Sequence, residues 1–110
     1  MKIDELTIAE AREIARLFEG QKQAENPFRI GACYLIRTVT MIQTGRLVQV
    51  TPTELVLEEA AWIADTGRFS DALLSLEFSE VEPFPDGRVI VGRGALIDAC
   101  EIARSPRAKK

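Results

Sequence analysis

The chain has 110 residues, of which 46% are hydrophobic and 28% charged. This length and balance predict one globular domain built around one core. A net charge of -3 argues against a general nucleic-acid-binding protein that relies on an overall positive field. No apolar run approaches the roughly 20 residues of a membrane span and no leader is recognisable, so we expect a cytoplasmic protein without a membrane anchor.

The chemical inventory argues against catalysis. The chain has no histidine, which removes the commonest general base and metal ligand near neutral pH. Cys33 and Cys100 lie far apart in the sequence and form no C-x-x-C pair, so we expect two buried free thiols and neither a disulfide nor a zinc site. The neighbouring acids Glu58 and Glu59 point to opposite faces of a strand. We predict a non-enzymatic protein with no cofactor and no metal.

The N-terminal segment is predicted to be a helix over residues 7–19. Thr7 and Glu10 have the spacing of a capping box, which satisfies backbone donors of the first turn. Gly20 is expected to end the helix, and residues 20–27 form a linker. An apolar stripe recurs at helical spacing in Ile8, Ala11, Ile14, Ala15, Leu17 and Phe18.

Residues 28–63 show a pattern typical of extended chain, with many β-branched residues. We predict a meander of three strands. Its turns are expected at Thr44-Gly45 and at Thr51–Thr53, with Trp62 extending or closing the sheet. Short strands in a small sheet leave edges that must be closed into a barrel or paired with another subunit.

Residues 64–87 are predicted to be an insertion between strands, with a short helix near Ser70 to Leu76 and a tight turn at Asp86-Gly87. Residues 88–103 follow as the last strands, with a corner at residues 92–94. The spacing of residues 95–103 also fits a closing helix, and both alternatives remain open.

The last seven residues, 104–110, carry four cations and no anion. Such a tail is typical of a solvated terminus. The alternative is a weak binding site for anions or for an acidic partner. Trp62 and Phe69 are large aromatic residues for which we expect core positions rather than stacking on a base.

The order of these elements resembles the Sm-like family. The resemblance covers Tyr34 to Ala99 and rests on the motifs Gly45-Arg46-Leu47-Val48, Glu54 to Ala60 and Val89 to Ile97, with residues 64–87 in the place of a variable loop. It implies an α+β, mostly β fold, in which an N-terminal helix precedes a strongly bent, five-stranded antiparallel barrel. It also implies rings formed by strand pairing between subunits, and RNA binding at the inner rim.

The chain departs from the family where RNA would bind. Of that site only Arg93 and Gly94 match, because Thr51-Pro52-Thr53 and Ala95 replace the family's polar residues. A uridine pocket is therefore not carried over. The whole chain also resembles small uncharacterised proteins of tailed phages and prophages, which implies origin more than activity.

Arginines beside glycine turns are the candidate binding residues, because a guanidinium binds phosphate or carboxylate bidentately and glycine lets backbone donors approach an anion. Arg37 is also expected to need an acid partner, either Asp65 or Asp98. The alternative for each arginine is an ion pair with a neighbouring acid. The candidate set is Arg93, Gly92, Gly94, Arg37, Arg46 and Arg68.

Two functions of different class follow. The first is a phage-borne homo-oligomer that binds a nucleotide or other small anion at subunit junctions, and that sequesters a host signalling nucleotide as an anti-defence protein. The second is a protein-interaction or assembly factor without a small ligand.

Overall fold

The computed structural model describes residues 7–13 and 26–110. Residues 8–13 are helical, and all described residues of this segment are exposed. Thr7 caps the segment as predicted: its Oγ1 accepts a hydrogen bond from the Glu10 N–H at 3.1 Å, and its carbonyl accepts one from Ala11 at 3.0 Å. The remainder of the predicted helix and most of the linker at 20–27 lie outside the described residues.

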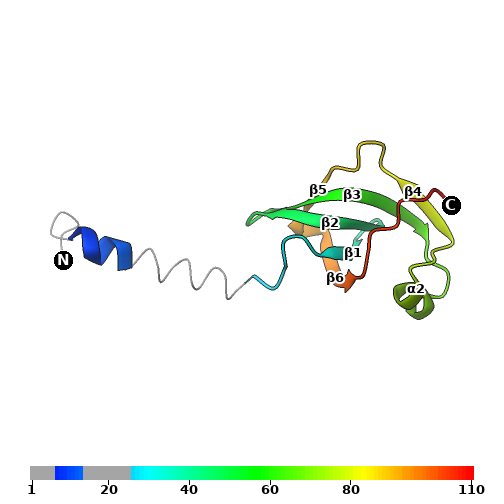
Figure 1. The fold of residues 1–110 in the computed structure, drawn as a ribbon, viewed down its shortest axis with the longest axis horizontal. Helices are drawn as coiled ribbons and strands as arrows, with labels where there is room; N and C mark the ends of the chain where they lie inside the picture. Colours follow the sequence, from blue (N-terminus) through cyan, green and yellow to red (C-terminus); the bar gives the residue numbers. More distant parts are fainter. Residues whose placement is uncertain (1–6, 14–25) are drawn as a thin grey trace.

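The described part of the chain is mostly β-structure (Figure 1). A short helix, α2 (Phe69–Ser75), lies between β3 and β4, one residue from its predicted start. A single 3₁₀ turn, η2 (Arg93–Ala95), lies between β5 and β6. The strands are β1 (Cys33–Thr38), β2 (Ile42–Val50), β3 (Glu54–Asp65), β4 (Glu80–Pro83), β5 (Val89–Gly92) and β6 (Leu96–Ile102).

All strand pairs are antiparallel, in the order β4-β3-β2-β1-β6, and β5 also pairs with β3. β3 thus has two partners along one edge. Its first residues, Glu54–Leu57, pair with β5, and its last ones, from Ala61 to Asp65, pair with β4. Between them Glu59 has a left-handed φ of 55°, and the register with β2 shifts there. This irregularity bends β3 into two halves.

The prediction of a closed, five-stranded barrel was wrong in two respects. The sheet has six strands, because the predicted insertion contains β4. It is also open, since no pairing among the described residues joins β6 to β4 or β5. The sheet nevertheless curls: η2 contacts both hairpin turns, through Arg93 N–H to the Thr53 carbonyl (2.9 Å) and Val39 N–H to the Ala95 carbonyl (3.0 Å).

The predicted turn at Thr44-Gly45 was also wrong, because both residues lie inside β2. The chain turns earlier, between Thr38 and Met41, where the Thr38 N–H and Oγ1 both bond to the Met41 carbonyl. Glycine is needed at position 45 for a different reason. A Cβ there would lie 2.8 Å from the Cβ of Leu57 on β3, so the glycine permits close approach of two strands.

Two apolar clusters lie on opposite faces of the sheet, as the alternation along β1 shows: Tyr34 and Ile36 face one cluster and Leu35 the other. The first cluster fills the curl of the sheet, and α2 covers the second. The buried members of the first cluster are Tyr34, Ile36, Leu47, Leu55, Leu57, Ala60 and Val91. Those of the second are Leu35, Ala61, Ile63, Ala72, Leu76, Phe78 and Val81.

Three further expectations are decided by the structure. Residues 96–102 are a strand and not a helix. Trp62, expected in the core, is 42% exposed, whereas Phe69 packs against the second cluster. The basic tail at 104–110, expected to be solvated, lies against the protein, with Pro106 buried and Lys110 bonded to Val81.

Candidate functional site: the arginines and the edges of the sheet

Arg93 is half-buried at the corner between β5 and β6. Its Nη1 donates to the carbonyl of Thr51 at 2.8 Å, and the guanidinium lies 5.7 Å from the ring centre of Phe28. It has no carboxylate partner among the described residues. The flanking Gly92 and Gly94 border open space, since an added Cβ would meet no atom within 4 Å. The corner therefore holds a positioned positive charge that no acid of residues 7–13 and 26–110 compensates.

Arg37, by contrast, is neutralised. Its Nε donates to Asp98 Oδ1 at 2.7 Å and its Nη2 bonds Oδ2, which makes a bidentate pair. This decides between the two expected partners in favour of Asp98. The Arg37 hydrogen bond lowers the pKa of the Asp98 carboxyl. The same guanidinium lies 5.1 Å from the ring centre of Phe69 at the start of α2. The cluster ties β1, β6 and α2 together.

Arg46 on β2 is also paired with acids, Glu58 at 3.1 Å and Glu59 at 3.5 Å, beside the bend of β3. The expectation that these two acids point to opposite faces was wrong, because the left-handed φ of Glu59 interrupts the alternation of the strand. Arg68 is exposed and has no ion pair among the described residues. Its carbonyl accepts the first hydrogen bond of α2, from Ala72 at 2.9 Å.

The predicted arginines form no common site within one chain. Arg93 contacts Thr51 and Phe28, whereas the partners of Arg37 and Arg46 are different residues. Of the predicted arginines, Arg37 and Arg68 have one neighbour in common, Phe69. The Arg37 guanidinium lies over the Phe69 ring, and Arg68 precedes Phe69 in the chain. Convergence of several arginines would therefore require more than one copy.

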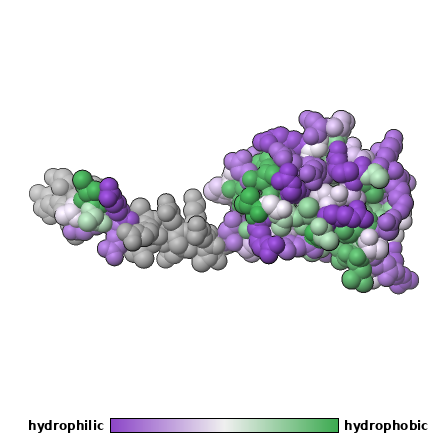
Figure 2. All heavy atoms as spheres, viewed as in Figure 1, coloured by the Kyte–Doolittle hydropathy of each residue, from purple (hydrophilic) through white to green (hydrophobic). Residues whose placement is uncertain are grey.

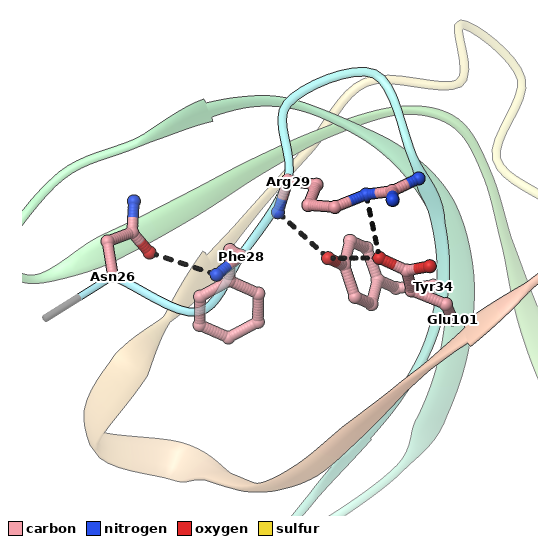
Figure 3. Close-up of polar contacts among 5 residues, drawn as sticks. All are labelled: Asn26, Phe28, Arg29, Tyr34 and Glu101. Carbon is pink, nitrogen blue, oxygen red and sulfur yellow. Dashed lines mark hydrogen bonds and ion pairs between the residues drawn. The ribbon is translucent and has the colours of Figure 1, made fainter. Parts of the chain in front are cut away.

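A polar network that the sequence did not indicate supports the Arg93 corner (Figure 3). The hydroxyl of buried Tyr34 accepts a hydrogen bond from the Arg29 N–H (2.9 Å) and donates one to Glu101 (3.2 Å), while Arg29 Nε lies 3.1 Å from the same carboxylate. Phe28 packs edge-on against Tyr34, with ring centres 5.6 Å apart. The network thus fixes the ring on which Arg93 lies. Tyr34 and Glu101 are too distant in sequence for any local pattern to connect them.

Two edges of the sheet are open in the part of the chain that the structure describes. β6 has no strand beyond it, and β5 pairs only with β3. Each displays an exposed isoleucine: Ile90 on β5 is 58% exposed and Ile97 on β6 is 62% exposed. On the face that Figure 2 shows, apolar side chains of the described residues form separate patches among hydrophilic ones.

Within residues 7–13 and 26–110, no cluster of three or more cysteines and acids is arranged to hold a metal ion. No helix in that part is long and apolar enough to cross a membrane. Comparisons with protein-family models, curated proteins and solved structures each found no match.

Proposed function

We propose that this chain is a non-enzymatic assembly protein that associates with further copies of itself through the edges of its sheet. The observation that carries the proposal is the pair of open edges, β5 and β6, each with an exposed isoleucine. Unpaired N–H and C=O groups on a strand are a template for pairing with another chain, and an edge that stays monomeric usually carries charges or proline. β5 has neither along Val89–Gly92, whereas β6 carries Asp98 and Glu101, which are paired with Arg37 and Arg29 of the same chain.

An Sm-like arrangement is part of this proposal. When β4 is set aside, the remaining strands follow the order β6-β1-β2-β3-β5 and curl until η2 contacts both hairpin turns. β4 then occupies the variable loop that the resemblance places at residues 64–87. Ring formation between β5 of one copy and β6 of the next would close both open edges. Phage or prophage origin stays part of the proposal on the resemblance of the whole chain.

Light scattering tests the association. We expect the wild-type chain to be oligomeric at micromolar concentration, and Ile97→Lys or Ile90→Lys to shift it to monomers, because a charge on an edge strand opposes pairing. Leu74→Lys is the matched control, since Leu74 is 88% exposed on α2 and belongs to neither edge. A wild-type protein that is strictly monomeric at these concentrations would refute the proposal.

A small anion bound at Arg93 is a second candidate function, favoured by its uncompensated charge beside open glycines. A thermal-shift screen with mono-, di- and cyclic nucleotides tests it, since a ligand at 100 times its Kd stabilises by about 2.7 kcal/mol. Arg93→Ala should abolish the shift, and Arg68→Ala, at an exposed arginine, should not. A screen in which no nucleotide gives a shift contradicts nucleotide binding and leaves assembly as the function.

A further inference from the structure

Residues 104–110, which we call the strap, run from the end of β6 to the outer edge of β4 (Figure 1). Lys110 and Val81 exchange both backbone hydrogen bonds, each at 2.9 Å, as in an antiparallel pair. The Arg107 guanidinium donates to the carbonyls of Ala60 and Phe84. The strap therefore occupies the strand position beside β4 and covers this edge, whereas the edges at β5 and β6 are open in the part of the chain that the structure describes.

The connection from β6 to the outer edge of β4 is short. β6 and β4 lie at opposite ends of the strand order. A position outside β4 is five interstrand spacings from β6, or about 24 Å along a flat sheet. Eight residue steps, from Ile102 to Lys110, reach at most roughly 29 Å when fully extended. Curvature of the sheet shortens the path, and the strap reaches β4 within its own chain although it bends at Ala103, Arg104 and Ala108.

Charge complementarity accompanies the backbone pairing. Lys110 Nζ lies 3.0 Å from the Glu77 carboxylate, and Lys109 Nζ lies 3.9 Å from that of Glu82. The hydrogen bond from Lys110 lowers the pKa of Glu77. Glu77 precedes β4 and Glu82 lies within it, whereas the charged side chains of the strap are all cationic. The β4 edge thus has the features of a site for an extended basic segment.

The strap is held by polar contacts and not by a core. Pro106 is its one buried residue, and the Ser105 hydroxyl is buried without a hydrogen-bond partner. Exposed ion pairs contribute only about 0–1 kcal/mol each. A buried hydroxyl without a partner works against docking. Such a segment can leave its edge without unfolding the sheet.

We propose that the β4 edge is a receptor for an extended basic segment, and that the strap of a second copy can fill it in exchange for the strap of the same chain. A strap from another copy makes the same pairing with Val81 and the same bonds from Arg107, without the constraint of the short connection to β6. Exchange of an identical element is a low-cost route to dimers. The interface differs from the β5 and β6 edges and does not depend on their association.

A charge-swap experiment on full-length protein tests the exchange. One variant, Glu77→Lys/Glu82→Lys, reverses the receptor, and the other, Lys109→Glu/Lys110→Glu, reverses the strap. In each alone the strap is repelled, and we expect hydrogen exchange at the Val81 amide to become about threefold to tenfold faster. In an equimolar mixture both crossed pairings are attractive. Native mass spectrometry should then show a 1:1 heterodimer, with protection of Val81 restored.

The combined fourfold variant is the matched control, because it restores complementarity within one chain and should recover wild-type protection. All proteins carry Ile97→Lys, so that association through β6 contributes nothing. The amide of Leu55, which lies between β2 and β5, should be equally protected throughout and reports an intact fold. A mixture without heterodimer, or a strap-reversed variant with wild-type protection at Val81, would overturn the proposal.

Discussion

The two halves of β3 pair with different strands along the same edge. The first half pairs with β5, whose far side is open among the described residues and whose strand is apolar. The second half pairs with β4, whose edge is covered by a basic strap that contacts the acids Glu77 and Glu82. The difference shows how one small sheet can leave one edge available for association while it occupies another with its own chain.

The joint between the halves lies at Glu59. Its left-handed φ and the register shift beside it turn the strand, and Gly87, with a φ of 76°, packs against its backbone. Ala60, the next residue, has a carbonyl that accepts bonds from Phe84 and from Arg107 of the strap. The bend therefore separates the partners of β3 and also creates the anchor point of the strap.

The largest effect is expected from Phe78→Ala. Phe78 is 1% exposed in the cluster beside β4. Its truncation should cost about 3–5 kcal/mol of unfolding free energy. Because both clusters pack on β3, we expect one cooperative transition in denaturant, followed alike by amides of β4 and β5. Earlier exchange of the β4 half alone would show that the two halves unfold independently.

Gly45→Ala should have the next largest effect. The added Cβ would lie 2.8 Å from that of buried Leu57, so the strands must separate, at a cost of about 1–3 kcal/mol. Gly94→Ala is the control, because its Cβ would meet nothing within 4 Å. Denaturant unfolding compares them. Equal stability of the two variants would mean that the close approach of β2 and β3 at position 45 is not required.

Glu59→Gly tests the joint itself. Glycine adopts a φ of 55° without the penalty of a side chain, so relief of up to about 1 kcal/mol is expected, reduced by loss of the 3.5 Å contact with Arg46. Thermal unfolding measures the net effect. A clear loss of stability would indicate that the ion pair, and not the backbone, maintains the bend.

The smallest effect concerns pH. Because Arg37 lowers the folded-state pKa of Asp98, this pair stabilises the protein above the usual carboxyl value of 3.8, and the contribution disappears as pH falls through the lower folded value. Asp98→Asn should therefore reduce stability more at pH 7 than near pH 2. Denaturant titrations at both pH values provide the comparison.

Local patterns predicted the elements that depend on neighbouring residues. The Thr7 cap and the turn at Thr51–Thr53 appear where threonine side chains accept hydrogen bonds from the backbone. The short helix α2 begins one residue before its predicted start, after Arg68 and without a side-chain cap. Gly45 misled the prediction, because glycine beside threonine fits a hairpin turn as well as a close contact between strands. The spacing of residues 95–103 fitted two structures, and pairing with β1 decided for a strand.

The partners of the charged residues followed no local pattern. Arg37 had two candidate acids, and only the register of β1 with β6 placed Asp98 beside it. The strap looked like a solvated tail, since nothing in residues 104–110 indicates that Lys110 reaches Val81. Composition, the alternation of apolar residues and the capping patterns thus predicted a mostly β protein, because each depends on residues that are close together in the sequence. Tertiary structure alone decided which edges are open and which is covered, because edge pairing joins residues that are far apart in the chain.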